Sequence, residues 1–218
     1  RRDVLFYKAV LRDADGLVTG LVGTLLDITE RKALEMRLAD LAQHDALTGL
    51  LNRRAILGYL DGLHKDRRQV HQPVCLTMID VDRFKSINDQ HGHAVGDEVL
   101  RKVSSCLKAQ LRDSDRVGRI GGEEFLIVLG STDLDDAQHV AERLRQEISA
   151  LTVEGCDGPL SPTVSLGLAQ SHSNEEDWAD VIGRADAALY EAKRAGRNRV
   201  VVAHDAVRSA SHKDWHRD

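Results

Sequence analysis

Two adjacent carboxylates follow a pair of glycines in this chain: the segment Gly121-Gly122-Glu123-Glu124 precedes the apolar run 125–129. A glycine pair between two strand-like runs predicts a tight hairpin, because a two-residue turn needs positive φ, which glycine adopts without steric cost. Glu123 and Glu124 would then lie where the edge of a sheet meets solvent. A charged hairpin tip without chemistry is the simplest alternative for this segment taken alone.

A third carboxylate, Asp80, ends the apolar run 74–79. If that strand runs in the same direction as the strand before the hairpin, its end lies beside Glu123 and Glu124. Three converging carboxylates repel one another unless a cation lies between them. Mg²⁺ prefers hard oxygen ligands, so it is the natural candidate, with Mn²⁺ as a substitute. A turn aspartate at a strand end is the alternative for Asp80 alone.

The segments that must position these side chains alternate between strand and helix patterns from Pro73 onward. Apolar spacing predicts helices over residues 97–111, 133–150 and 177–195, and strands over 74–79, 163–169 and 200–202. The order strand, helix, hairpin, helix, strand predicts an α+β fold with a ferredoxin-like βαββαβ core and additional carboxyl-terminal elements. The tail, residues 204–218, shows no periodicity and is expected to be disordered.

The amino-terminal residues read as two strands, 4–10 and 17–26, joined by a turn at 13–16. Two strands alone cannot bury a core, so this segment is expected to end a larger domain or to pair with something else.

A helix is expected to follow, because Asp27 and Glu30 have the spacing of a capping box. Leu34, Leu38 and Leu41 fall on one of its faces. Such a narrow stripe suits a coiled-coil seam between two chains, although so short a stripe more often packs on its own domain.

Composition sets the bounds for these interpretations. The 218 residues are 42% hydrophobic but only 4% aromatic, which leaves room for one aliphatic core with appendages. The net charge of -5 argues against general nucleic-acid binding, which requires a basic surface. Three cysteines without metal-ligand spacing favour reduced thiols. No membrane-spanning or signal-peptide pattern is found, so a cytoplasmic location is expected, with a membrane anchor possible upstream in a longer protein.

The segment that begins Asp80-Val81-Asp82-Arg83-Phe84-Lys85 and runs to Asp97, together with Gly121-Gly122-Glu123-Glu124-Phe125, closely resembles the GGDEF family of diguanylate cyclases. These enzymes join two GTP molecules into cyclic di-GMP and release pyrophosphate. The resemblance extends over residues 45–203 and includes an entry motif at 45–54 and a closing motif at 190–198. The departures are mild: Glu123 stands where the family name has Asp, and Ile120 where an aromatic residue is common.

The resemblance implies that Asp80, Glu123 and the backbone of Val81 bind metal. It assigns Glu124 to metal binding or to activation of the attacking hydroxyl. Asn88 and Asp97 match the pair that reads guanine. The adjacent N1–H and amino groups of guanine are donors that suit a carboxylate acceptor, and an amide can bond to O6 or N3. For Asp97, the alternative is a helix N-cap.

The resemblance also implies contacts to the triphosphate. The backbone of Arg83 and Phe84 and the side chains of Lys85, Lys193 and Arg197 match these positions. Lys193 and Arg197 are four residues apart at a predicted helix end, where cations that complement the helix dipole are the alternative.

The activity implied is attack of the 3′-hydroxyl of one GTP on the α-phosphorus of another, assisted by Mg²⁺. Each domain of the family holds one GTP, so a homodimer is expected to be required. An Arg-x-x-Asp pattern, Arg112 to Asp115, is separated from Gly121 by five residues, the family spacing for an inhibitory site that binds the product. Arg143 is similar in position to a supporting arginine. Taken alone, such a pattern is more often a helix-end charge pair.

The amino-terminal strands and the Asp27-Ile28-Thr29 junction resemble the end of a PAS sensor domain. The expected organisation is a PAS remnant at 1–28, a linker helix at 29–44, a cyclase domain at 45–203 and the tail. Two other functions compete with the enzyme: a catalytically silent receptor of cyclic di-GMP, which needs only Arg112 and Asp115, and a pure dimerisation module, which needs neither these nor the carboxylates.

Overall fold

The structure, a computed structural model, describes residues 2–32, 34, 42–66, 73–172 and 177–203. The chain divides into two compact units, Arg1–Ala42 and Gln43–Asp218. Each unit is a structure in its own right and is described separately.

The first unit is a long antiparallel hairpin of β1 (Val4–Arg12) and β2 (Val18–Asp27), as the sequence predicted. Its turn is closed by Asp13, whose carboxylate accepts hydrogen bonds from the backbone of Asp15 and Leu17. Large apolar side chains lie exposed along both strands, so the hairpin by itself buries no core. A helix starts at Thr29; Leu38 and Leu41 of the predicted apolar stripe, like the predicted tail, lie outside the described residues.

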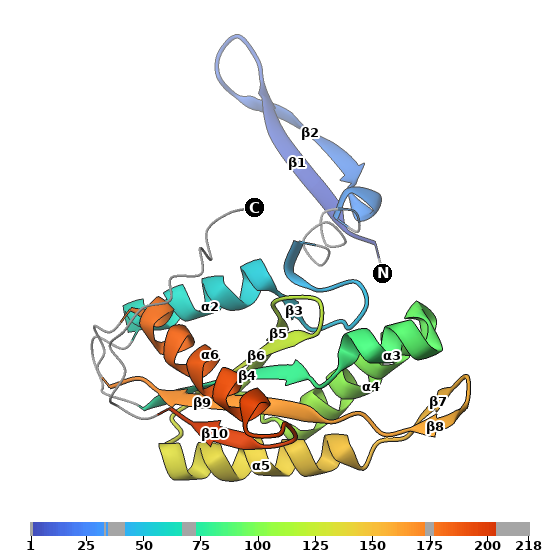
Figure 1. The fold of residues 1–218 in the computed structure, drawn as a ribbon. Helices are drawn as coiled ribbons and strands as arrows, with labels where there is room; N and C mark the ends of the chain where they lie inside the picture. Colours follow the sequence, from blue (N-terminus) through green and yellow to red (C-terminus); the bar gives the residue numbers. More distant parts are fainter. Residues whose placement is uncertain (1, 33, 35–41, 67–72, 173–176, 204–218) are drawn as a thin grey trace. The chain divides into compact units, whose positions relative to one another are not determined.

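The second unit is built on a six-stranded sheet in the order β10-β9-β4-β6-β5-β3 (Figure 1). Its centre consists of β4 (Val74–Val81), β6 (Glu124–Gly130), β5 (Arg116–Arg119) and β9 (Val164–Gln170), and neighbouring strands there are antiparallel. This is the strand order and direction of a ferredoxin-like βαββαβ core. The predicted fold class is confirmed.

Two short strands extend this core in parallel. β10 (Val200–Val202) pairs with β9 and is the additional carboxyl-terminal strand that the sequence predicted. β3 (Leu51–Asn52) pairs with β5 at the other edge. A separate small hairpin is formed by β7 (Val153–Gly155) and β8 (Gly158–Leu160). The sequence reasoning did not predict β3, β7 or β8, because runs of two or three residues carry no readable alternation.

Helices cover both faces of the sheet. α4 (His93–Gln110) and α5 (Leu134–Ser149) pack on one face with Ile79 and Phe125, while α2 (Arg53–Asp66) and α6 (Trp178–Arg194) pack on the other with Met78 and Leu126. Alternate residues of β4 therefore face opposite cores, as the two-residue period of a strand requires. In the part of the chain that the structure describes, no helix has the length and apolar character needed to cross a membrane.

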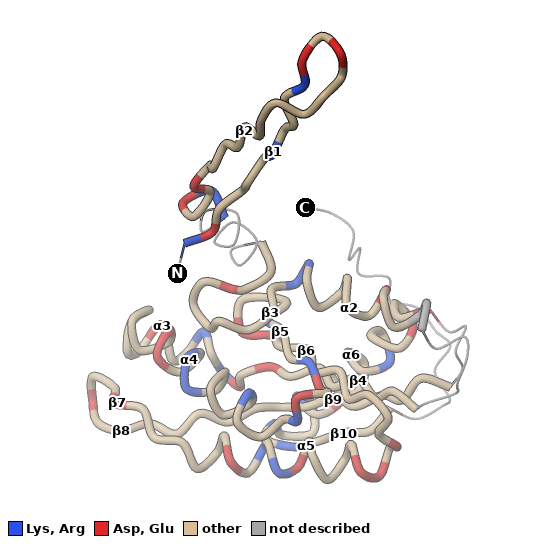
Figure 2. The backbone as a smooth tube through the Cα atoms, turned by 180° about the vertical axis from the view of Figure 1, so that it is seen from behind, with Lys and Arg blue, Asp and Glu red and all other residues tan. Residues whose placement is uncertain are grey.

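Asp133 and Asp177 cap α5 and α6 with their side chains, so the predicted helix starts at these residues are confirmed within one residue. Acidic and basic residues are interspersed along the elements of the second unit (Figure 2).

Two local predictions were wrong. The segment after β4 forms its own helix, α3 (Phe84–His91), and α4 begins at His93, so Asp97 lies inside a helix and is not its N-cap. Gly92, with φ 85°, separates the two helices. The glycine pair does not make a two-residue turn either: residues 120–123 join β5 to β6, and neither Gly121 nor Gly122 has positive φ.

Candidate active site

Asp80 lies near the end of β4, and the pleat of that strand decides where its side chain goes. Leu76 and Met78 precede it on the same face and pack beneath α6. Asp80 continues this row beyond the apolar core, opposite Glu124 of β6 and Ser165 of β9. It remains only 6% exposed, which is unusual for a carboxylate.

Lys193, in the last turn of α6, places its Nζ 2.7 Å from Oδ2 of Asp80. Burial nevertheless raises the pKa of Asp80 to about 6; the ammonium of Lys193 lowers it, and the nearby charges of Glu123 and Glu124 raise it further. In the chain alone, therefore, a single ammonium does not compensate for the burial of this carboxylate.

Glu123 and Glu124 stand at the start of β6, on the loop that the sequence singled out. The carbonyl of Glu123 accepts a hydrogen bond from the N–H of Val81 at 3.2 Å, which ties the loop to the end of β4. A Cβ at Gly121 would lie 2.5 Å from Oε2 of Glu124. A side chain at position 121 would therefore displace the carboxylate of Glu124 from the place it takes in the structure.

The structure brings Asp80, Glu123 and Glu124 to one end of the sheet, as predicted. Within the described residues, however, no three His, Cys, Asp or Glu side chains form a ready-made metal cluster. The carboxylates are neighbours without being a closed set of ligands.

Arg119 holds the loop in place, a role that the sequence reasoning missed. Its guanidinium donates to the carbonyls of Gly121 and Gly122, and its Nη1 donates to both carboxylate oxygens of Asp45 at 3.0 and 3.2 Å. Asp45 also accepts from the backbone N–H and hydroxyl of Thr48, and these partners lower its pKa despite its burial. The only available signal was the position of Arg119 two residues before the glycines.

Asn88 of α3 and Asp97 of α4 are brought together at the contact between their helices. The Oδ1 of Asn88 is buried and has no hydrogen-bond partner in the described structure. It points at Gly96, where any Cβ would overlap with it. A buried acceptor without a donor is costly unless a ligand supplies one. The predicted guanine-reading pair thus presents an unsatisfied acceptor next to a half-buried carboxylate.

The predicted phosphate-contacting residues lie at the adjoining ends of β4 and α6. Arg83 is the N-cap of α3, so the N–H groups of Phe84 and Lys85 belong to the open first turn of that helix. Lys85 and Arg197 are exposed, whereas Lys193 is engaged with Asp80.

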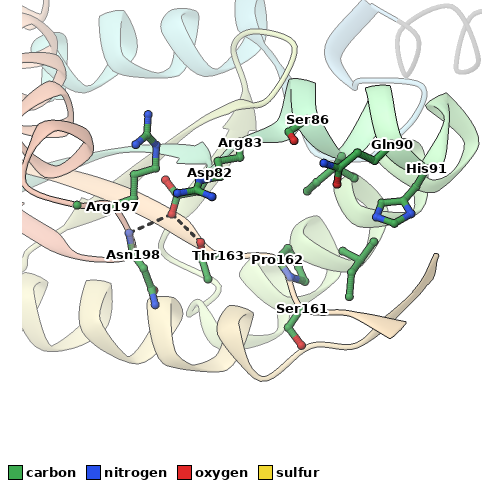
Figure 3. Close-up of a pocket in the computed structure, with 13 residues that line it drawn as sticks. Asp82, Arg83, Ser86, Gln90, His91, Ser161, Pro162, Thr163, Arg197 and Asn198 are labelled. Carbon is green, nitrogen blue, oxygen red and sulfur yellow. Dashed lines mark hydrogen bonds between the residues drawn. The ribbon is translucent and has the colours of Figure 1, made fainter. Parts of the chain in front are cut away.

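A buried carboxylate that the sequence reasoning did not assign, Asp82, fixes the loop that carries Arg197. It accepts hydrogen bonds from the hydroxyl of Thr163 at 2.8 Å and the backbone N–H of Asn198 at 3.0 Å (Figure 3). The hydroxyl of Ser165 donates a third, at 2.7 Å. Asn198 in turn accepts a hydrogen bond from Arg145 of α5. The only sequence signal for Asp82 was its position two residues after Asp80.

The predicted inhibitory site lies in the connection between α4 and β5. Asp115 accepts a hydrogen bond from the backbone N–H of Arg112 at 3.0 Å, and Arg143 of α5 donates to the carbonyl of Gln110 at the end of α4. Arg112 and Asp115 line a cavity of about 280 Å³ together with His44. Thus the structure brings Arg143 to the helix end that precedes Arg112.

Known proteins resemble this chain over most of its length. The family model "Diguanylate cyclase, GGDEF domain" matches residues 42–199. "Diguanylate cyclase DgcM" of Escherichia coli K12 is 43% identical over 177 residues, which are 81% of this chain and 42% of that protein. A "Diguanylate cyclase" of Vibrio cholerae is 38% identical over 203 residues, which are 91% of this chain and 63% of that protein. The chain thus spans only part of the length of these relatives.

Solved structures of GGDEF domains also resemble this chain. The coiled coil and GGDEF domain of DgcB from Caulobacter crescentus, in complex with c-di-GMP, superposes with a TM-score of 0.74 at 33% identity, and the match covers 80% of this chain and 92% of that one. An active GGEEF domain of a diguanylate cyclase from Vibrio cholerae gives 0.67 at 36% identity, with 72% and 99% covered. With the fold, the hairpin and the neighbouring helices in agreement, the chain belongs to the GGDEF-domain family of diguanylate cyclases.

Proposed function

We propose that this chain condenses two molecules of GTP into cyclic di-GMP with release of pyrophosphate. One observation carries the proposal: Asp80 is buried beside Glu123 and Glu124 with a raised pKa, at the sheet end where Asn88 presents its unsatisfied acceptor. An acid that is kept charged at neutral pH in such surroundings is typical of a site that receives a cation. The family membership connects this chemistry to GTP.

The residues present fit a divalent ion of the magnesium type. All candidate ligands are hard oxygens: the carboxylates of Asp80, Glu123 and Glu124 and the carbonyl of Val81. Mg²⁺ is commonly held by one or two carboxylates together with substrate phosphates and water, so the lack of a closed three-ligand cluster among the described residues is in keeping with it. Mn²⁺, which shares this preference, is expected to substitute. When bound, the ion would stabilise charge on the phosphoryl oxygens and on the pyrophosphate.

The other residues would bind and orient the substrate. Asn88 and Asp97 would read the guanine edge. Adenine would leave the buried acceptor unpaired, which disfavours binding of adenine by about 1–3 kcal/mol. The open first turn of α3, at Phe84 and Lys85, would bind phosphate oxygens through backbone N–H groups. Lys193, which pairs with Asp80 in the chain alone, would turn to the triphosphate with Arg197.

In the reaction, the 3′-oxygen of one GTP forms a bond to the α-phosphorus of the other, and the bond from that phosphorus to the bridging oxygen breaks. Pyrophosphate leaves with the electron pair, and the same step with the roles of the two nucleotides exchanged closes the ring and releases a second pyrophosphate. Glu124 would accept the proton of the attacking hydroxyl. Since each domain would hold one GTP, the reaction requires two domains that face each other, supplied by a homodimer. The amino-terminal hairpin and the helix after it, as a PAS remnant and a linker, would set the geometry of that pair.

Arg112, Asp115 and Arg143 would bind the product and inhibit the enzyme. Arginine suits this task because its planar donor fork matches phosphate and the guanine edge. A silent receptor of cyclic di-GMP is the second candidate, and the cavity beside Arg112 and Asp115 is the observation in its favour.

The test is to incubate the chain with GTP and Mg²⁺ and to look for cyclic di-GMP by mass spectrometry. Asp80→Asn and Glu124→Gln, which remove one charge each at nearly constant volume, are expected to lower product formation at least 100-fold. If a dimer that binds cyclic di-GMP forms no product from GTP, the receptor is the correct function.

A further inference from the structure

The loop after α6, residues 195–199, carries Arg197, and its backbone has an unusual conformation. Gly196, Arg197 and Asn198 have φ of 117°, 67° and 45° in succession. Glycine adopts such angles without steric cost, whereas the left-handed region costs conformational energy for Arg197 and Asn198. A strained conformation of this kind persists only where the surrounding contacts impose it. The place of the Arg197 side chain therefore depends on what holds this loop.

The contacts that hold the loop come from three parts of the fold. The carbonyl of Ala192, in α6, accepts a hydrogen bond from the N–H of Arg197 at 3.0 Å. The buried carboxylate of Asp82 accepts one from the N–H of Asn198, also at 3.0 Å. The side chain of Asn198 points away from Asp82 (Figure 3), and its Oδ1 accepts a hydrogen bond from Nη1 of Arg145 at 2.8 Å. Arg145 of α5 thus fixes the side chain of Asn198.

A neighbouring acid aligns Arg145 for this contact. The Nε of Arg145 donates to both carboxylate oxygens of Glu142, at 3.1 and 2.9 Å, and its Nη2 donates to Oε1 at 2.6 Å. Gln146 donates to the same oxygen at 3.0 Å. The side chain of Arg145 is 18% exposed, so most of it is excluded from water. A planar guanidinium that is already fixed through two nitrogens loses little freedom when the third bonds to Asn198.

The strength of this contact is matched to the strain in the loop. A hydrogen bond from a charged donor and the cost of one left-handed residue are of the same order. Loss of the bond from Arg145 is therefore enough to release Asn198, and the adjacent Arg197 moves with it. Within the described residues, the wall of the cavity beside Arg197 contains Asn198 but not Arg145. Arg145 therefore influences a ligand there only through Asn198.

We propose that Arg145 is a positioning residue: through Asn198, it holds the loop that presents Arg197 to the terminal phosphates of GTP. The inference rests on the proposed function and extends it to α5, a helix with no expected contact to the substrate. Glu142 supports this role because it orients the guanidinium. Removal of Arg145 should lower the affinity for the terminal phosphates without removing any contact to the nucleotide itself.

The first test follows hydrogen exchange at the amides of Arg197 and Asn198 in the chain without nucleotide. Arg145→Gln is expected to accelerate exchange at both amides at least tenfold, because their hydrogen bonds open when the loop is released. Arg101→Gln is the matched control, since Arg101 also pairs with an acid three residues earlier in its helix, Glu98 of α4. The control should exchange like the original chain, and unchanged exchange in Arg145→Gln would overturn the inference.

The second test measures binding of GTP and GMP by calorimetry with Mg²⁺ present. Arg145→Gln is expected to weaken GTP about tenfold and to leave GMP, which lacks the terminal phosphates, unchanged. A variant that only folds less stably would weaken both nucleotides alike, so equal losses for GTP and GMP would overturn the positioning role.

Asn198→Gly separates the backbone of the loop from its side chain. Glycine adopts the left-handed conformation without help from Arg145, so Arg145→Gln added to Asn198→Gly is expected to cause no further loss of GTP affinity. A second tenfold loss in that background would show that Arg145 does not act through Asn198.

Failure of this inference differs from failure of the proposed function. If Arg145→Gln frees the loop and weakens GTP in a chain that makes no cyclic di-GMP, the positioning role stands and the proposed function fails. If the chain makes cyclic di-GMP while Arg145→Gln binds GTP like the original, the function stands and the positioning role is refuted.

Discussion

Asp80 is the residue on which the proposed chemistry depends, and its burial predicts a particular pH dependence of stability. Its pKa is about 6 in the folded chain against the usual 3.8. A raised carboxyl pKa means that the folded state holds the proton more tightly than the unfolded state. The resulting stabilisation, about 3 kcal/mol, is fully present below pH 3.8 and is lost as the pH rises through 6.

Urea unfolding of the metal-free chain and of Asp80→Asn at several values between pH 4 and pH 8 measures this contribution. The free energy of unfolding of the original chain, minus that of Asp80→Asn, is expected to fall by about 2 kcal/mol over this range, because at pH 4 part of the full effect is already lost. Titrating groups remote from Asp80 are common to both proteins and cancel. A difference that stays constant with pH would show that Asp80 is not perturbed.

Arg112 is the residue that tests the inhibitory site. Because a guanidinium that binds phosphate or guanine contributes a charge-assisted hydrogen bond, Arg112→Ala is expected to raise the inhibition constant of cyclic di-GMP at least tenfold. Initial rates at increasing product concentration measure it. Arg101→Ala serves as the control, because Arg101 is also an exposed arginine but pairs with Glu98 within α4. This variant should retain inhibition. Unchanged inhibition in Arg112→Ala would show that Arg112 does not belong to an inhibitory site.

At the scale of elements, the contact between α3 and α4 is the missed feature that bears most on the site. The polar stretch from Asp82 to Gly92 carries no apolar stripe, and α3 has no fully buried residue. Periodicity therefore could not reveal α3.

The strands, α5 and α6 were predictable because their apolar spacing and aspartate caps agree with their structure. Asp80, Glu123 and Glu124 were found because strand direction alone brings them together, whereas Arg119 and Asp82 act through contacts between distant segments.

Gly96→Ala tests how closely α3 and α4 must approach. A Cβ at Gly96 would overlap with Oδ1 of Asn88 and press on Phe84, so Asn88 must move. Affinity for GTP, measured by calorimetry, is expected to fall roughly tenfold while circular dichroism stays the same.

Gly58→Ala is the matched control, because Gly58 lies in α2 with open space around its Cβ position. This substitution should bind GTP normally and stabilise the chain by about 1 kcal/mol, since alanine favours a helix over glycine. Equal GTP affinity in Gly96→Ala and Gly58→Ala would show that Asn88 does not read the base.

At the scale of the whole molecule, one chain holds one set of the residues that the proposed reaction needs. The carboxylates, the unsatisfied Asn88 acceptor and the cations of α6 lie at one end of a single sheet. The proposed reaction joins two nucleotides, so the second must arrive on a second copy. The exposed apolar hairpin of β1 and β2 shows that the first unit buries no core by itself. That this hairpin ends a PAS sensor domain is a prediction from the sequence resemblance.

The most direct test of this account measures cyclic di-GMP formed from GTP and Mg²⁺ per chain, over a dilution series that runs from dimer to monomer, with the oligomeric state followed by light scattering. The account predicts that cyclic di-GMP appears and that its rate per chain falls with the dimer fraction until it nearly vanishes. A rate per chain that stays constant in fully monomeric protein, or no cyclic di-GMP from confirmed dimer, would contradict it.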